Sequence, residues 1–202
     1  MIIQAQEKKI YTPEEYLEFE VNSDTRHEYI NGEIIPMTGG TPSHNDLASI
    51  LNAILRTNLK GSPYSIFIAD QRLWIPDFGI HTYPDVMVVP KPILLRNATA
   101  IELQAGRKDT VTNPVLIAEV LSKSTKSYDR DEKFAAYRTI STFQEYLLID
   151  QYTPHVEQYS KTDANKWIFS EYDSLKAYVE LQSIACNIPL ADIYSDIEFE
   201  EK

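Results

Sequence analysis

Glu119 is the residue of this sequence that most requires a chemical explanation. It lies in the run 115–121, whose remaining residues are all apolar. A continuous apolar run of this kind predicts a strand buried on both faces of a sheet. Burying an ionised carboxylate there is costly unless the carboxylate is paired with a cation or binds a metal. Two explanations stay open: a metal ligand, or an acid held in a structural ion pair or at a strand end in water.

Asp85 poses the same question. It follows Pro84 at the start of the short apolar run 85–90, which predicts another strand. An aspartate at a strand start also commonly binds a neighbouring backbone amide, so this role is the alternative. Adjacent strands lie about 4.8 Å apart, so Asp85 and Glu119 could share one cation if their strands are neighbours.

Lys133 is a third candidate for chemistry. Residues 126–140 predict a helix in which Lys133 is in line with the apolar stripe formed by Ala136, Tyr137 and Ile140. A lysine on that stripe must extend past the apolar surface to water or meet an acid. Its alternative role is an ion pair with Asp129, one turn earlier and in the favoured acid-first order.

The remaining elements must position these side chains. Thr12 and Pro13 predict the start of a short helix, and Asn31-Gly32 between two short runs predicts a hairpin. Periodic leucines and isoleucines predict a helix over residues 43–60, capped by Ser43 and stopped by Gly61. The predicted strands are 64–69, 71–75, 84–90, 115–121 and 145–150, followed by a hairpin over 155–160 and 166–172. Residues 91–113 predict a loop with some structure of its own, and the tail from about 189 a short helix with an acidic end.

Composition limits the class of protein. The 202 residues suit a single domain over 1–202, with a core of about 11–150 and a C-terminal β extension of about 151–202. Cys186 is the one cysteine and lies in an apolar stretch, so it should be packed and cannot form an internal disulfide. We find no signal-peptide pattern and no run of about 20 apolar residues, so we expect a cytoplasmic protein with no membrane partner.

The net charge of −11 argues against a broad basic face that coats DNA, although acids are what a divalent cation requires. The four histidines show no metal-binding spacing and suggest ordinary surface or core roles; they are His27, His44, His81 and His155. Gly39-Gly40 lacks the lysine of a phosphate loop, and Ser122 and Ser124 lack a nucleophile-elbow context.

Several segments occur in a distinctive order: Glu28 in an early strand, Pro84-Asp85, then Glu119, then a helix carrying Lys133. This order resembles the PD-(D/E)XK nuclease superfamily. The sequences of the individual segments are similar to those of its Uma-two family of restriction-endonuclease-like proteins. The matching stretches are 12–16, 27–33, 83–86, 118–125, 129–137 and 145–146. The resemblance implies an α/β (α+β) restriction-endonuclease-like core: a central mixed sheet flanked by helices, with an N-terminal helix and hairpin and a C-terminal antiparallel hairpin.

The resemblance also implies roles for residues. Asp85 and Glu119 would ligate Mg²⁺ or Mn²⁺, together with the backbone carbonyl of Val120, and Glu28 would help to hold the metal or a water. The lysine that the superfamily carries two residues after the glutamate is Leu121 here. In the Uma-two family this lysine comes from the following helix, which Lys133 matches, and Lys123 and Lys126 are alternatives on the loop.

The implied activity is metal-assisted hydrolysis of a DNA phosphodiester, in which the lysine orients water and offsets developing charge. One alternative is a nuclease-like fold without cleavage that acts as a nucleic-acid or protein binding or regulatory module. Another is an unrelated α/β protein whose acids make structural ion pairs. Convergence of Glu28, Asp85, Glu119 and Lys133 would argue against the latter. The edge of the C-terminal hairpin is one place where a homodimer could form.

Overall fold

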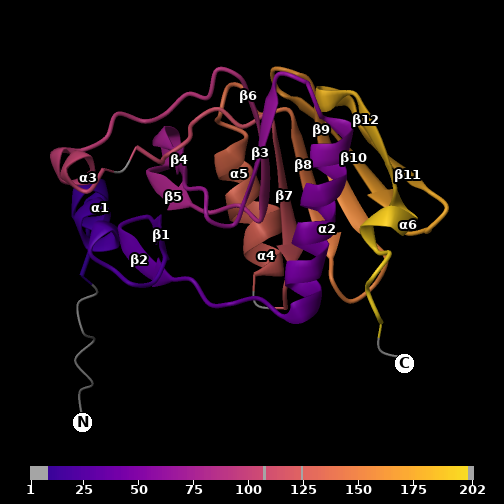
Figure 1. Cartoon of the computed structure of the whole chain (residues 1–202), viewed down its shortest axis with the longest axis horizontal. Coiled ribbons are helices and arrows are strands. Elements are labelled where there is room, and N and C mark those ends of the chain that lie inside the picture. The colour runs from indigo at the N-terminus through magenta and orange to yellow at the C-terminus, as the bar shows by residue number, and fades with distance from the viewer. Residues whose placement is uncertain (1–8, 107, 124, 200–202) are drawn as a thin grey trace, which may run out of the picture.

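A six-stranded mixed sheet forms the centre of the protein (Figure 1). The computed structural model describes residues 9–106, 108–123 and 125–199, so Ser124 and the acidic end of the tail, residues 200–202, lie outside the described residues. The strand order is β10-β9-β8-β7-β6-β3, in which the β7–β8 pair is parallel and the other neighbouring pairs are antiparallel. The strands are β3 (Tyr64–Ile68), β6 (Val86–Pro90), β7 (Leu116–Leu121), β8 (Glu145–Asp150), β9 (Val156–Asp163) and β10 (Lys166–Tyr172).

Strand β7 is buried along its whole length, as its apolar run predicts. Successive side chains of a strand point to opposite faces of the sheet. Leu116 and Val120 accordingly pack in one hydrophobic cluster, and Ile117 and Leu121 in another on the opposite face. Glu119 therefore points to the same face as Ile117 and Leu121.

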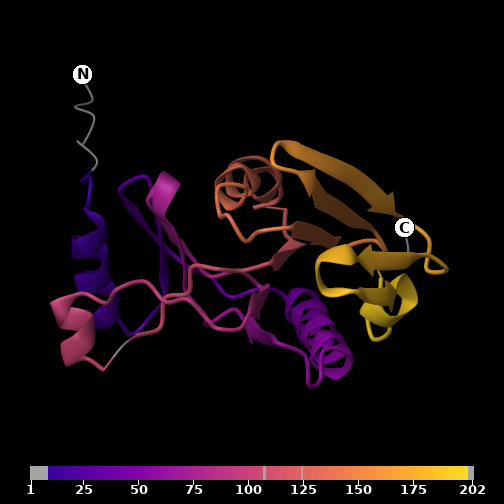
Figure 2. The ribbon, with the colours of Figure 1, turned by 90° about the horizontal axis from the view of Figure 1, so that it is seen from above.

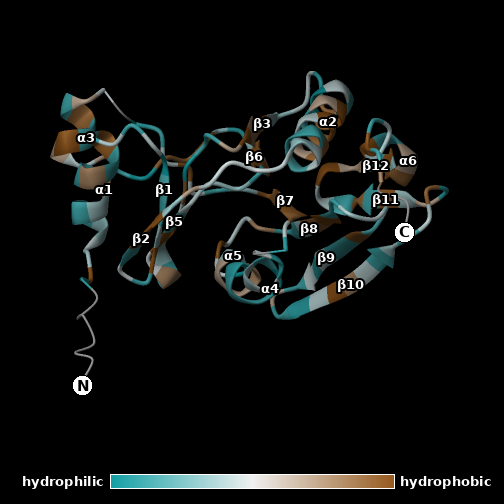
Figure 3. Cartoon of the chain, turned by 90° about the horizontal axis from the view of Figure 1, so that it is seen from below, coloured by the Kyte–Doolittle hydropathy of each residue, from teal (hydrophilic) through white to brown (hydrophobic). Residues whose placement is uncertain are grey.

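The two faces of the sheet are covered by different helices (Figure 2). One face is covered by α2 (Pro42–Asn58), whose Leu47, Leu51 and Leu55 are fully buried. The other is covered by a helical segment that replaces the regular helix predicted over residues 126–140. It consists of α4 (Lys126–Tyr128), a π turn η2 (Asp129–Lys133) and α5 (Phe134–Tyr137). Apolar residues gather on the strands and helix faces that meet between these layers (Figure 3).

The start of α2 differs from its prediction. Thr41, rather than Ser43, is the N-cap, and its hydroxyl accepts a hydrogen bond from the His44 N–H. Proline suits the first helical position because it lacks an N–H, so Pro42 favours a cap directly before it. The helix ends at Asn58, and Gly61 follows with a φ of +81°.

A smaller unit forms around a second sheet of order β2-β1-β5-β4. Thr12 caps the first helix, as predicted, in a reciprocal capping box with Glu15. Asn31 and Gly32 have φ angles of +50° and +87°, the left-handed conformations that a tight hairpin turn requires. The elements are α1 (Pro13–Val21), β1 (His27–Ile30), β2 (Glu33–Pro36), β4 (Leu73–Ile75), the 3₁₀ helix η1 (Pro76–Phe78), β5 (Ile80–Thr82) and α3 (Ala100–Gln104).

The C-terminal region adds a hairpin that the sequence did not predict. It consists of β11 (Tyr178–Leu181), the 3₁₀ helix η3 (Gln182–Ile184) and β12 (Cys186–Pro189), and the predicted short helix follows as α6 (Leu190–Ile193). Cys186 is buried, as expected, in the hydrophobic cluster that also contains Val120. Within the described part of the chain, we find no helix with both the length and the apolar character needed to cross a membrane.

Candidate functional site

Asp85, directly before β6, lies beside Glu119 of the neighbouring strand β7. Val86 pairs with Ala118 in the antiparallel β6–β7 ladder, which places the preceding Asp85 next to Glu119. The Asp85 N–H donates to Glu119 Oε2 at 3.2 Å, and the Val120 N–H donates to Asp85 Oδ2 at 2.8 Å. The Glu119 side chain is 4% exposed and that of Asp85 18%, so the pair lies where the buried strand reaches the surface.

Lys133 brings the other acids to this pair. Its Nζ lies 3.2 Å from Glu119 Oε1, 3.3 Å from Asp129 Oδ1 and 3.8 Å from Glu28 Oε1. Both contacts considered from the sequence, with a buried acid of the sheet and with Asp129, therefore occur together. Glu28 reaches the group from β1 and also accepts a hydrogen bond from the hydroxyl of Thr82. The structure thus brings Glu28, Asp85, Glu119 and Lys133 together.

Burial and the charges of neighbouring groups act in opposite directions on the pKa values of this group. Burial raises the pKa of Glu119 from 4.5 to about 8, although Lys133 acts in the opposite direction. Burial lowers the pKa of Lys133, but Glu119 and Glu28 outweigh it and raise that pKa well above its ordinary value. The arrangement concentrates negative charge that a cation, either the lysine or a metal, can offset.

Two residues that the sequence did not single out contact the acids. His44 lies in the first turn of α2, and its Nε2 is 3.2 Å from Asp85 Oδ2. The hydrogen bond to Asp85 raises the pKa of His44 above its usual value, against the effect of burial. The hydroxyl of the fully buried Tyr137 donates to Glu119 Oε1 at 2.7 Å. Tyr137 could have been found one turn after Lys133, whereas no spacing links His44 to Asp85.

The other residues expected near the metal are placed as follows. Lys123 lies over the ring of Tyr152, with Nζ 5.2 Å from the centroid. Among the residues described, neither Lys123 nor Lys126 forms an ion pair with the candidate acids. Val120 contributes its N–H to Asp85, and the expected role of its carbonyl remains a prediction.

A hollow of about 430 Å³ opens beside Glu28. It lies between the β1–β2 hairpin and the helical segment, and its lining includes Ile30, Tyr128 and Glu132. Of the acid–lysine group, Glu28 is the member that lines this hollow. Glu132 adds a further acidic side chain at its wall.

A second group could also hold a cation. His155, Glu157 and Glu171 place ligand atoms within 4.8 Å of one another. Among the described residues, no three acids of the group around Lys133 lie this close together. However, Arg130 Nε lies 3.0 Å from both carboxylate oxygens of Glu157 and already offsets its charge. Arg130 would therefore compete with a metal ion for Glu157.

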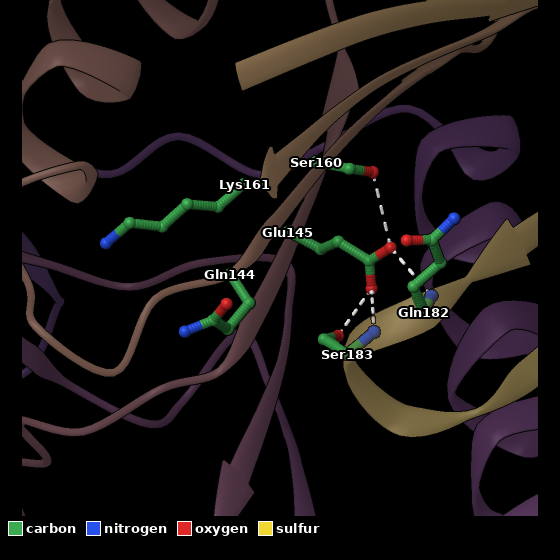
Figure 4. A pocket seen from close by; sticks show the side chains of 6 residues that line it. All are labelled: Gln144, Glu145, Ser160, Lys161, Gln182 and Ser183. Atoms are coloured by element: carbon green, nitrogen blue, oxygen red, sulfur yellow. Dashed lines mark hydrogen bonds between the residues drawn. The ribbon is translucent and has the colours of Figure 1, made fainter. Parts of the chain in front are cut away.

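A smaller hollow, of about 140 Å³, surrounds Glu145 (Figure 4). Lys161 and Gln144 extend away from this carboxylate, whereas Ser160, Gln182 and Ser183 surround it. The backbone N–H groups of Gln182 and Ser183 donate to Glu145 at 2.9 and 3.1 Å, and Ser183 also donates through its hydroxyl. Glu145 therefore joins β8 to η3, and its oxygens are occupied by protein donors.

The fold matches that of a solved structure. A solved chain described as "a putative nuclease belonging to DUF820" from Anabaena variabilis superposes with a TM-score of 0.71, covering 91% of this chain and 97% of that chain at 20% identity. The sequence places the protein more closely: residues 13–191 match the Uma2 family model, described as "Putative restriction endonuclease", and the chain belongs to this family.

Two relatives from Synechocystis sp. support this assignment. "Uncharacterized protein sll1609" is 41% identical over 85% of this chain and 93% of its own length. "Uncharacterized protein slr1290" is 32% identical over 93% of each chain. The resemblance in the sequence to a restriction-endonuclease-like fold and family is thereby confirmed.

Proposed function

We propose that this protein is a divalent-metal-dependent endonuclease that hydrolyses DNA phosphodiester bonds, with Glu28, Asp85, Glu119 and Lys133 as its catalytic residues. The observation that carries this proposal is the meeting of Asp85, Glu119 and Lys133 at the edge of a buried strand, with Lys133 Nζ 3.2 Å from Glu119 Oε1. Family membership supports the reaction class.

The donor set fits Mg²⁺ or Mn²⁺. Carboxylate and carbonyl oxygens are the ligands that these hard cations prefer, and such ions often complete their shells with water and substrate phosphate. Asp85 Oδ1 receives no hydrogen bond from the described residues, because both donors to this carboxylate contact Oδ2. Asp85, Glu119 and the carbonyl of Val120 would hold the metal, with Glu28 assisting directly or through water.

The bound metal would polarise the scissile phosphate and lower the pKa of a bound water. Lys133 would orient the attacking water and offset the negative charge that develops on the phosphate. The buried position of Lys133 favours this role because charge interactions are stronger away from bulk water. Glu28 lies 3.8 Å from the ammonium group and also lines the adjacent hollow.

The test is cleavage of supercoiled plasmid and of single-stranded and branched DNA, with Mg²⁺, Mn²⁺ or EDTA. We expect metal-dependent cleavage by the wild type, reduced by about 100-fold or more in Asp85→Asn, Glu119→Gln and Lys133→Met. His155→Gln and Glu171→Gln, in the second acidic group, are the controls and should cleave normally.

Wild-type rates in the Asp85 and Glu119 variants would overturn the site assignment. Binding of DNA without cleavage of any substrate, despite bound Mn²⁺, would instead favour the alternative of a nuclease-like module that binds nucleic acid. The net charge of −11 opposes contact with DNA phosphates, so it favours the other form of this alternative, in which the nuclease-like fold binds a protein partner.

A further inference from the structure

Asp85 and Glu119 use their oxygens in the same way. Asp85 Oδ2 accepts the Val120 N–H and lies 3.2 Å from His44 Nε2, while Oδ1 receives no hydrogen bond from the described residues. Glu119 Oε1 accepts the Tyr137 hydroxyl at 2.7 Å and lies 3.2 Å from Lys133 Nζ, while Oε2 accepts one N–H from Asp85. In each acid, side-chain donors engage one oxygen and leave the other less occupied.

His44 is held in place by a chain of hydrogen bonds from β7. Gln151, which is 5% exposed, donates through Nε2 to the carbonyl of Leu121 at 2.8 Å. Its Oε1 accepts the hydroxyl of Thr41 at 2.5 Å, and Thr41 in turn caps the backbone N–H of His44. The first turn of α2 is thus tied to the strand that carries Glu119, close to the end where the acids lie.

Tyr137 is held by aromatic packing instead. Its ring is fully buried and contacts Tyr146 and Phe143 with centroid distances of 5.4 and 5.8 Å. A buried ring packed in this way has little freedom to rotate, so its hydroxyl has a fixed direction. The Tyr137 ring and the backbone of His44 are therefore held in place, and the two donors come from helices on opposite faces of the sheet.

We propose that His44 and Tyr137 are positioning residues that each hold one oxygen of a metal-binding carboxylate, so that the other oxygen is presented to the cation. This inference rests on the proposed metal site. Hydrogen bonds to metal ligands fix their orientation, and their loss typically weakens metal affinity by about 10–100-fold. His44 acts on Asp85, and Tyr137 acts on Glu119.

The alternative is that both donors serve only to satisfy buried oxygens. Tyr146 separates the two explanations because it is as buried as Tyr137, but its hydroxyl donates to the carbonyl of Asp129 at 3.0 Å. Removing either hydroxyl costs a buried hydrogen bond, yet only Tyr137→Phe releases an oxygen of Glu119. A purely structural role predicts the same behaviour for both variants.

The experiment is calorimetric titration of Mn²⁺ alone into the full chain, with the Tm of each variant measured in EDTA. We expect His44→Ala and Tyr137→Phe to raise the Kd for Mn²⁺ by about tenfold or more. Tyr146→Phe should lower the Tm as much as Tyr137→Phe while keeping the wild-type Kd. His44→Gln, which retains a side-chain N–H donor, should restore most of the affinity lost in His44→Ala.

Wild-type affinity in His44→Ala and Tyr137→Phe would overturn the inference while leaving the metal site standing. Equal weakening by Tyr146→Phe would also overturn it, because the effect would then follow from lost packing. Absence of Mn²⁺ binding by the wild type would overturn the metal site and this inference together. Loss of binding only in His155→Gln would do the same by moving the metal to the second acidic group.

Discussion

Replacing Glu119 with glutamine should remove a specific pH dependence of stability. Glutamine keeps the shape of the side chain but cannot ionise. Glu119 is 3% exposed, and burial raises its pKa from 4.5 to about 8 in the folded chain. A carboxyl group whose pKa rises on folding binds more protons in the folded state than in the unfolded state. Its stabilising protonation is therefore lost as the pH rises between about 4.5 and 8.

The size of the effect follows from the two pKa values. The difference between 4.5 and about 8 corresponds to about 5 kcal/mol at about 1.4 kcal/mol per pKa unit, as an upper limit reached above pH 8. Small proteins unfold with a total free energy of about 5–15 kcal/mol, so this loss would be a large fraction of the whole. Glu119→Gln should not show it, since the amide has no proton to lose.

The assay is urea unfolding in EDTA at several pH values from 5 to 9, for both the wild type and Glu119→Gln. Every other titratable group is common to the two proteins, so the difference between their free energies of unfolding isolates Glu119. We expect that difference to change in favour of the variant as the pH rises. Parallel curves across this range would show that Glu119 does not change its proton affinity on folding, and the reasoning would be wrong.

Three further predictions follow from the same contacts. Because burial raises the pKa of Glu119 to about 8, Mn²⁺ binding at pH 7 should release about 0.9 proton, and this number should fall towards zero at pH 9.5. Calorimetry in buffers of different ionisation enthalpy measures the number of protons released, and a number that does not change with pH would contradict the prediction. Lys133→Met leaves Glu119 and Asp129 without their ammonium partner, so urea unfolding at pH 8 should show a loss of about 3–5 kcal/mol in the free energy of unfolding. The loss should be smaller at pH 5, where the raised pKa of Glu119 keeps this carboxyl neutral; equal losses would count against the ion pair with Glu119. Gly32→Ala places a Cβ 2.5 Å from Ile10 Cγ2 at a φ of +87° and should lower the free energy of unfolding by about 1–2 kcal/mol. In the control Gly39→Ala the new Cβ meets nothing within 4 Å, so this free energy should change by no more than about 0.5 kcal/mol. Similar values for both variants in urea unfolding would refute this account of the turn.

Much of the fold could be predicted from periodicity. The apolar run of β7 and the leucines of α2 are buried as expected, because each pattern by itself determines which side chains must leave water. The Asn31-Gly32 turn has the predicted left-handed backbone for the same local reason. The β11–β12 hairpin was missed because its strands have only four residues each, which is too short for their alternation of buried and more exposed residues to stand out in the sequence. Its position depends on distant contacts, such as those of Glu145 with the turn between the strands.

Some residues of the candidate site could likewise be predicted from the sequence, and others could not. Asp85, Glu119 and Lys133 could be proposed because each is a charged residue within an apolar pattern, whereas Glu28 was proposed only from the resemblance in the order of segments. His44 could not be proposed, since its contact with Asp85 joins the start of a helix to a strand 41 residues later and follows no local period. The π turn was also hidden, because the apolar stripe of residues 126–140 fits a regular helix equally well.

In the proposed site, Lys133 takes the place of the lysine that the superfamily carries at the position of Leu121, because both positions lie on the same face of the sheet. Leu121, where the superfamily carries lysine, is 1% exposed and packs in the cluster that contains Ile117 and Phe134. An ammonium at that position would have to displace core packing beside Glu119, at a cost of several kcal/mol. Lys133 reaches the same carboxylate from the helix that covers this face, and the π turn ends at this residue. Because a π turn changes the direction in which the following side chains point, the turn η2 and Lys133 together place the ammonium group beside Glu119. Leu121→Lys would therefore not compensate for the loss of Lys133, because the ammonium group is reached from the helix and the strand position is filled by core packing.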